Sequence, residues 1–116
     1  GATGTGKTHT MARVIEQESA YRPEIIDCRM TSAAGAQGIA QIMPRWHPQA
    51  RPCDPWHSID YAAGYLAALF VQFGTWREAV AAYNWGPGNL ARWGLDRAPL
   101  ETRNYLAALQ RDGFLT

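Results

Sequence analysis

The sequence has almost no net charge, few charged residues and no long apolar run. Its 116 residues carry a formal net charge of +1, and only 18% of them are charged, so no overall field attracts a nucleic acid or an anionic membrane. No stretch approaches the roughly 18 to 20 uninterrupted apolar residues that span a bilayer. We therefore expect no nucleic-acid partner and no membrane association, while a hydrophobic content of 47% is ample for a folded core.

Cysteine is also scarce. Two are present, Cys28 and Cys53, and without a Cys-x-x-Cys pair or a nearby histidine cluster they do not match the spacing of a zinc site. We expect neither a metal nor a cofactor. Both cysteines lie in loop-like segments, and the sequence leaves open whether they form a disulfide or remain free thiols.

β-branched residues are few, and no segment alternates polar and apolar residues as a strand does. The apolar spacing instead predicts an all-α fold, a compact domain of five or six short helices around one central apolar helix. Irregular connections are expected at residues 24–35 and 45–57. The predicted helices cover residues 11–20, 36–43, 59–73, 76–83, 89–93 and 100–111, of which 59–73 is the central one.

Cap residues set the expected helix boundaries. Thr10 and Ser58 are expected N-caps, and residues 75–78 form a Thr-x-x-Glu capping box. Gly74 and Gly113 are expected to follow the last residues of their helices, where glycine readily adopts the left-handed conformation. Each predicted helix boundary therefore rests on a local signal.

The first eight residues, Gly-Ala-Thr-Gly-Thr-Gly-Lys-Thr, match the Gly-x-x-x-x-Gly-Lys-Thr pattern of phosphate-binding loops. Such a loop joins a strand to a helix N-terminus within a parallel sheet, and no strand or sheet is predicted. We interpret residues 1–8 as a flexible leader and residues 9–116 as the folded domain. Because the chain starts without methionine, we expect a processed protein or a domain excised from a longer one.

One carboxylate lies on an apolar helix face. Met11, Val14 and Ile15 recur at helical spacing, and at about 100° per residue Glu18 falls in the middle of their face, whereas Glu16 points away. Burial raises the pKa of a carboxyl, which then holds a proton near neutral pH and can donate it to a leaving oxygen. Glu18 is therefore a candidate general acid; the alternative is a glutamate at the core edge, bonded to backbone groups or an arginine.

Four motifs occur in a fixed order at residues 18–23, 32–44, 82–88 and 101–105: Glu-Ser-Ala-Tyr-Arg-Pro, Ser-Ala-Ala-Gly-Ala-Gln-Gly-Ile-Ala-Gln-Ile-Met-Pro, Ala-Tyr-Asn-Trp-Gly-Pro-Gly and Glu-Thr-Arg-Asn-Tyr. With them the chain resembles the catalytic domain of soluble lytic transglycosylases, in the lysozyme-like superfamily, over residues 9–110. The resemblance implies a lysozyme-like fold and peptidoglycan glycan strands as the partner. It also implies a location outside the cytoplasm or on a virion, and we take a monomer as the default.

The resemblance implies that Glu18 is the sole catalytic acid and base. Tyr83 and Asn84 match the pair beside that acid, where the tyrosine hydroxyl bonds to the catalytic carboxyl. Ser19 has the simpler expected role of bonding back to a helix carbonyl.

The resemblance assigns four further residues to substrate binding. Ser32 matches a serine near the cleaved sugar, and Gln41 and Met43 match residues that line the groove. Glu101 matches an acidic residue that contacts the glycan strand or its peptide stem. Met43 could instead fill the core, and Glu101 could serve only to complement a helix dipole.

No second acid lies on an obviously core-facing stripe near Glu18, which fits a mechanism with one carboxylate. The resemblance implies cleavage between N-acetylmuramic acid and N-acetylglucosamine, with ring closure by the muramyl C6 hydroxyl to a 1,6-anhydro product. One alternative is hydrolysis, in which Glu24 or Asp27 positions water; both lie in a loop longer than in many relatives. The other is a non-catalytic wall-binding or phage-tail structural domain.

Aromatic residues exceed what a small core needs, with five Trp and five Tyr. Tyr83 and Trp85 are expected at the groove, and Trp85 stands where the family commonly has alanine. Phe70 and Phe73 are assigned to the core. No position is assigned to Trp46, Trp56, Trp76 and Trp93.

Overall fold

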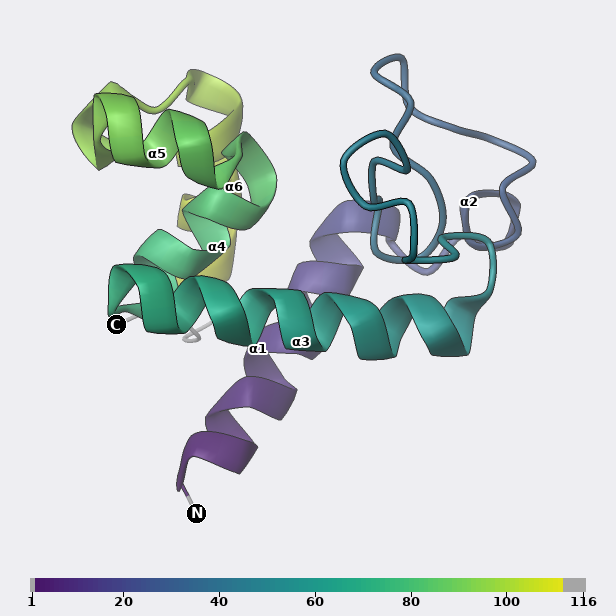
Figure 1. Cartoon of the computed structure of the whole chain (residues 1–116), viewed down its shortest axis with the longest axis horizontal. Helices are drawn as coiled ribbons and strands as arrows, with labels where there is room; N and C mark the ends of the chain where they lie inside the picture. The colour runs from purple at the N-terminus through teal and green to yellow at the C-terminus, as the bar shows by residue number, and fades with distance from the viewer. Residues whose placement is uncertain (1, 112–116) are drawn as a thin grey trace. The chain divides into compact units, whose positions relative to one another are not determined.

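The computed structural model describes the backbone of residues 2–111 and the side chains of residues 11–111 (Figure 1). The chain divides into two units. One, the loop-rich unit, is Met11–Gly64; the other, the helical unit, comprises Gly1–Thr10 and Tyr65–Thr116. The two longest helices contribute residues to both units.

Residues 2–111 form six α-helices and one short 3-10 helix. These are α1 (Ala2–Ser19), α2 (Pro23–Ile26), α3 (Pro55–Phe73), α4 (Trp76–Trp85), α5 (Pro87–Trp93), η1 (Leu95–Arg97) and α6 (Leu100–Arg111). Within that range there is no strand, and the one isolated antiparallel bridge pairs Gln37 with Ile42. The all-α prediction is confirmed. None of the helices in the described part of the chain has the length and apolar character needed to cross a membrane.

α1 begins at Ala2, so the predicted N-cap at Thr10 is wrong. Glycine and threonine have low helix propensity, but adding residues to an existing helix costs far less than nucleating a new one. Residues 2–8 of the phosphate-loop pattern therefore fall in the first turns of α1. The helix continues across residues 8 and 9, and the division into leader and domain stays a prediction. α1 ends at Ser19, and Pro23 is the first residue of α2, a short helix that was not predicted.

α3 also begins earlier than predicted, at Pro55. Asp54 is the N-cap, since its Oδ1 accepts a hydrogen bond from the backbone N of His57 at 3.2 Å, and proline suits the first helical position. Ser58, the predicted cap, is instead fully buried inside the helix. At the other end Gly74, with φ +89°, directly follows the last residue of α3 as predicted.

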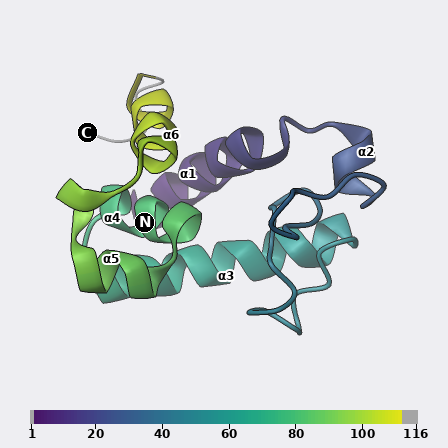
Figure 2. The same cartoon turned by 90° about the horizontal axis from the view of Figure 1, so that it is seen from above.

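The helical unit is held by packing of α4 against both α5 and α6 (Figures 1 and 2). The capping box is confirmed, because Thr75 Oγ1 accepts from the backbone N of Glu78 at 3.1 Å. The last helix, α6, has the predicted bounds, and its expected terminator Gly113 lies outside the described residues. The buried apolar side chains of α4, α5 and α6 are Ala79, Val80, Ala81, Ala82, Leu90, Tyr105, Leu106 and Leu109.

The loop-rich unit contains a turn where a helix was predicted at residues 36–43. Gly38 and Gln41 have φ of +77° and +49°, values that an α-helix excludes. Gln37 and Ile42 exchange two backbone hydrogen bonds of 2.9 Å across the turn. The carbonyl of Pro52 lies so close to Gly38 that an added Cβ would be 1.7 Å from its oxygen. The prediction failed because this contact comes from a residue distant in sequence and overrides the local apolar spacing.

A disulfide joins Cys28 to Cys53, with 5.5 Å between their Cα atoms. The sequence had left open whether these cysteines are bridged or are free thiols, and the structure shows that they are bridged. The bond ties the segment after α2 to the segment before α3, across a sequence separation of 25. No helix or strand lies between these two cysteines, so the bond constrains the least regular part of the described chain.

Breaking the disulfide will destabilise the protein. Closing a loop of this length removes unfolded-state entropy worth about 3 to 4 kcal/mol in the chain-entropy model. We expect Cys28→Ser with Cys53→Ser to lower the free energy of unfolding by about that amount in urea titrations. Equal unfolding midpoints for the oxidised protein and the double variant would contradict a stabilising role.

Gly38→Ala should be strongly destabilising, because it adds both a left-handed alanine and a clash with the Pro52 carbonyl. We expect a loss of about 2 kcal/mol or more in the free energy of unfolding. Gly64→Ala is the matched control: its Cβ would meet nothing within 4 Å inside α3, and it should stabilise by about 0.5 to 1 kcal/mol. The reverse order of the two unfolding midpoints would rule out the turn described above.

Candidate functional site

Glu18 lies in the last turn of α1. Met11, Val14 and Ile15 are buried, which confirms the predicted apolar face, and Glu18 is half-buried. Glu16 is occupied elsewhere, since its Oε1 accepts from Arg13 Nη1 at 3.0 Å on the surface of the same helix. Glu18 thus combines a carboxyl with the apolar side of α1, the setting expected of a general acid.

The chain around Glu18 is held by its neighbour Ser19. As predicted, the Ser19 hydroxyl donates to the Ile15 carbonyl at 3.1 Å, and it also accepts from the Tyr21 backbone N at 3.2 Å. Ala20 and Tyr21 both have positive φ, a conformation that non-glycine residues adopt only when their surroundings enforce it. The Tyr21 hydroxyl donates to the Ala12 carbonyl at 2.9 Å. The turn after Glu18 is therefore fixed at several points.

Ser32 is half-buried and closes a small turn in the loop-rich unit. Its Oγ accepts from the Ala36 backbone N at 2.8 Å, and its own backbone N donates to the Ala36 carbonyl at 3.0 Å. The hydroxyl oxygen is thereby held in place while its proton is still available for donation. This geometry fits a residue that orients a polar group of a ligand.

Gln41 and Met43 lie in and just after the turn that replaced the predicted helix, and both are half-buried. Gln41 Nε2 donates to the Gly38 carbonyl at 3.1 Å, which leaves its side-chain oxygen as the group that can accept from a ligand. The Met43 carbonyl accepts from the backbone N of both Trp46 and His47 at 3.0 Å. Both positions are fixed by backbone contacts rather than by a helix.

In the helical unit, Tyr83 and Asn84 lie in the last turns of α4. The Asn84 Oδ1 accepts from Thr102 Oγ1 at 2.8 Å, and the Tyr83 ring centroid is 5.9 Å from that of Tyr65. The Thr102 bond orients the Asn84 amide, so its nitrogen points away from Thr102 and can donate to a ligand. Glu101, the residue before Thr102, is exposed in the first turn of α6.

Thr102 is a supporting residue that the sequence analysis missed. It is 1% exposed and lies on the apolar stripe of α6 with Tyr105, Leu106 and Leu109. A hydroxyl at helical spacing within an apolar stripe needs a hydrogen-bond partner, and that signal could have identified it. Its partner proves to be a predicted site residue, Asn84.

The predicted site residues divide between the two units. The loop-rich unit holds Glu18, Ser32, Gln41 and Met43, and the helical unit holds Tyr83, Asn84 and Glu101. The contacts given above for each group are contacts within its own unit. The bond expected between the Tyr83 hydroxyl and the Glu18 carboxyl stays a prediction.

The two other acids considered for catalysis are paired with arginines. Glu24 Oε1 accepts from Arg22 Nε at 2.8 Å, and a hydrogen bond from its own backbone N–H, together with Arg22, lowers the Glu24 pKa. Asp27 accepts from Arg29 Nε with both oxygens, at 3.0 and 2.8 Å. A lowered pKa makes the Glu24 carboxylate a weaker base. Across the described residues, no group of three or more His, Cys, Asp or Glu side chains could hold a metal ion.

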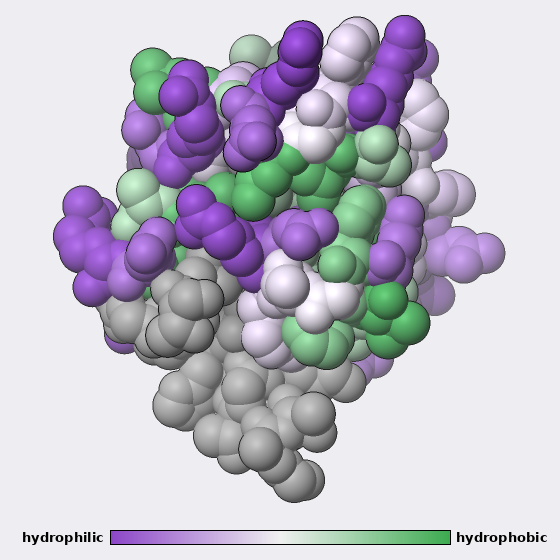
Figure 3. Space-filling model, turned by 90° about the vertical axis from the view of Figure 1, so that its left-hand side faces the viewer, coloured by the Kyte–Doolittle hydropathy of each residue, from purple (hydrophilic) through white to green (hydrophobic). Residues whose placement is uncertain are grey.

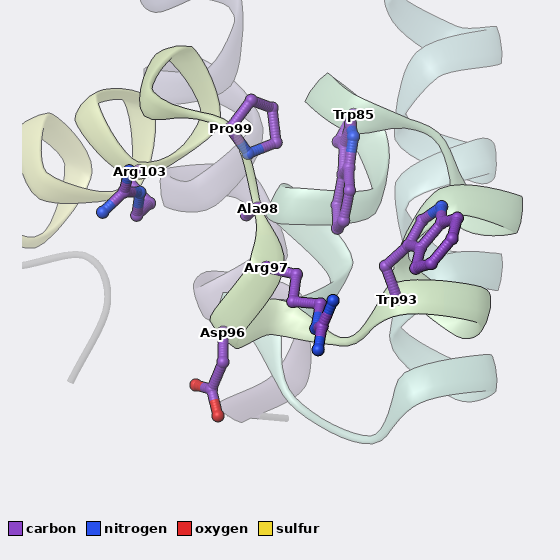
Figure 4. Close-up of a pocket in the computed structure, with 7 residues that line it drawn as sticks. All are labelled: Trp85, Trp93, Asp96, Arg97, Ala98, Pro99 and Arg103. Atoms are coloured by element: carbon purple, nitrogen blue, oxygen red, sulfur yellow. The ribbon is translucent and has the colours of Figure 1, made fainter.

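An open hollow of about 590 Å³ lies in the helical unit beside the end of α4 (Figure 4). Trp85 contributes to it, and its expected place at the sugar-binding groove stays a prediction. Trp93, which had no assigned position, contributes to it too. The lining includes Trp85, Trp93, Asp96, Arg97, Pro99 and Arg103.

Residues 3–106 match the protein family described as the transglycosylase SLT domain. The chain is 32% identical over 101 residues to the soluble lytic murein transglycosylase of Escherichia coli strain K12, and the match covers 75% of this chain. The protein of the same name from Salmonella typhimurium strain LT2 has the same identity over the same length. The matched region is 15% of the length of these relatives. No solved structure gives a significant match.

Removing the Thr102 hydroxyl will leave Asn84 without its donor. Valine has nearly the same shape as threonine, so Thr102→Val isolates the hydrogen bond, and we expect a loss of about 1 to 2 kcal/mol in the free energy of unfolding. Thr102→Ser keeps the hydroxyl and tests whether the bond alone suffices to orient the amide. Urea titration measures both variants; a Thr102→Val protein as stable as the wild type would show that the bond does not hold Asn84.

Proposed function

Because the chain belongs to the transglycosylase SLT domain family, we propose that it is the catalytic domain of a peptidoglycan lytic transglycosylase. Its substrate is the glycan strand, cut at the β-1,4 bond between N-acetylmuramic acid and N-acetylglucosamine. One observation supports Glu18 as the acid. This residue is half-buried at the end of the apolar face of α1, and it lies within the residues that match the family. The relatives' name, soluble lytic murein transglycosylase, supports the same activity.

The reaction uses one carboxyl twice, first as an acid and then as a base. Glu18 first donates its proton to the glycosidic oxygen, which leaves with the N-acetylglucosamine unit as the bond to the muramyl C1 breaks. The substrate's own acetamido group stabilises the positive charge that develops at C1. The Glu18 carboxylate then takes the proton from the muramyl C6 hydroxyl, whose oxygen bonds to C1 and closes the 1,6-anhydro ring. Glu18 ends the cycle protonated, and no water is consumed.

The state of the neighbouring acids favours this route over hydrolysis. An enzyme that activates water needs a second carboxylate as base. Glu24 and Asp27, the acids considered for that task, are held in arginine pairs, and the Glu24 pKa is lowered. Glu24 is therefore a weaker base, and both oxygens of Asp27 already bond to Arg29. The muramyl C6 hydroxyl is therefore the proposed nucleophile.

The remaining site residues position the strand. Ser32, Gln41 and Met43 line the groove on the loop-rich unit, each held by the contacts described above. Asn84 presents its amide nitrogen to the substrate because Thr102 occupies its oxygen. Tyr83 and Glu101 complete the set. The hydroxyl of Tyr83 bonds to the acid. Glu101 contacts the strand or its peptide stem.

The proposed place of action is outside the cytoplasm, or on a virion that delivers the domain to a cell wall. The Cys28–Cys53 disulfide supports this location, because disulfides persist in oxidising compartments and are rare in the cytosol. The domain is proposed to act as a monomer.

Glu18→Gln should abolish lysis. The amide has the size of the carboxyl but cannot donate and regain a proton, so we expect clearance of purified cell walls to slow by about 100-fold or more. Turbidity of a wall suspension follows the reaction, and thermal unfolding checks that the variant is folded.

Two matched controls assign the loss to Glu18. Glu16→Gln changes an acid on the same helix that pairs with Arg13, and Glu24→Gln changes the acid of the hydrolytic alternative. Both should clear walls at close to the wild-type rate. Full activity in Glu18→Gln would refute the proposed acid, and a comparable loss in Glu24→Gln as well as in Glu18→Gln would favour hydrolysis.

A further inference from the structure

Two indole rings and a guanidinium lie together in the hollow of the helical unit. Trp85 ends α4, Trp93 ends α5 and Arg97 ends η1. Figure 4 shows Arg97 reaching toward the side on which the two indoles lie, whereas the Asp96 carboxylate points away from both rings. The hollow therefore presents two indole surfaces and one guanidinium group to a ligand.

Local contacts support the two tryptophans in different ways. The carbonyl of Trp85 accepts from Asn89 Nδ2 at 2.8 Å, which fixes the backbone turn between α4 and α5 from which this indole extends. The guanidinium of Arg92 lies 4.7 Å from the centroid of the Trp93 ring, a cation–π contact to an indole residue that is 47% exposed. The Trp85 backbone and the Trp93 ring therefore each have a supporting contact.

Of the two arginines that line the hollow, Arg97 and Arg103, Arg97 is the one that reaches toward the side of the indoles, and no ion pair of Arg97 with a carboxylate is found among the described residues. Within the part of the chain that the structure describes, the ion pairs are those of Arg13, Arg22 and Arg29. Arg97 is exposed and makes none of them. Its planar fork of donors matches a carboxylate in two parallel hydrogen bonds, so its position favours an external anion.

The surroundings suit a polar chain rather than a broad apolar surface. The face of the molecule drawn in Figure 3 shows hydrophilic residues among and around the hydrophobic ones rather than one broad apolar surface. The volume of about 590 Å³ lies within the range of ligand-sized pockets. A ligand that combines a carboxylate with aliphatic or ring C–H groups would engage both the guanidinium and the indoles.

From this arrangement we infer that Trp85, Trp93 and Arg97 form a subsite for the peptide stem of peptidoglycan, with Arg97 binding a free carboxylate of the stem. The inference rests on the proposed function. The glycan strand itself is neutral where the muramyl lactyl group is amide-linked, so free carboxylates belong to the stem. Trp85 directly follows Asn84 in the chain, so the subsite continues from a proposed substrate-binding residue. Stem-bearing strands are therefore the preferred substrate.

The test measures binding of three soluble probes by calorimetry. These are the disaccharide N-acetylglucosaminyl-N-acetylmuramic acid with a tetrapeptide stem, the same compound with its stem carboxylates amidated, and the disaccharide without a peptide, which carries a free lactyl carboxylate. None contains the bond that the proposed reaction cuts, so binding is separated from catalysis. We expect the first probe to bind about tenfold or more tightly than the other two.

Arg97→Gln should abolish that preference, and Trp85→Ala should weaken binding of the two probes that carry a stem while leaving binding of the peptide-free probe unchanged. Arg77→Gln is the matched control, since Arg77 is an exposed arginine of α4 outside the hollow, bonded to Gln110; its binding should equal that of the wild type. Thermal unfolding confirms that the variants are folded. Equal affinity of the wild type for the first two probes, or an Arg97→Gln protein that keeps the preference, overturns the inference.

Two further outcomes separate this inference from the proposed function. Equally tight binding of the peptide-free probe assigns Arg97 to a lactyl carboxylate and overturns the stem assignment. A wild-type protein that shows the Arg97-dependent preference but does not clear cell walls refutes the lytic function while supporting the subsite. A protein that clears walls without any stem preference refutes the subsite alone.

Discussion

The burial of one face of α1 is the constraint on which the proposed site depends. Met11, Val14 and Ile15 must be removed from water, and helical geometry then carries Glu18 to the same side one turn later. Ser19 closes that turn through bonds to the backbone before and after it. The position of the acid is therefore fixed by apolar burial and backbone hydrogen bonds, which persist whether or not a substrate is bound. A catalytic group needs this kind of support from a rigid element.

The two units hold their site residues by different physical means. In the loop-rich unit the Cys28–Cys53 disulfide and the close contact of Gly38 with Pro52 take the place of regular secondary structure. In the helical unit, tight helix packing buries Thr102, whose hydroxyl orients a site amide. The polar groups of the proposed site are thus supported by contacts within their own units. The aromatic residues at the end of α4 and α5 extend this surface beyond the residues that the family resemblance assigns.

Sequence reasoning was most successful where helical periodicity decides the outcome. Glu18 could be placed because helical periodicity alone decides which face it occupies. The start of α3 was missed although its signal, an aspartate followed by proline, is local and readable at Asp54. The turn at residues 36–43 could not be predicted, because its geometry depends on Pro52, which is distant in sequence. Thr102 carries a readable signal, a hydroxyl within the apolar stripe of α6, but its partner Asn84 lies on another helix and no spacing rule identifies that partner.

The most direct test of a reaction with a single carboxyl is the mass of its product. Purified peptidoglycan digested with the protein and analysed by mass spectrometry should release muropeptides that end in 1,6-anhydro-N-acetylmuramic acid. Each of these is lighter by one water than the corresponding reducing-end fragment, because ring closure by the C6 hydroxyl consumes no water. Muropeptides with a free reducing end as the primary product would show that water is the nucleophile and would contradict the proposed role of Glu18 as sole acid and base.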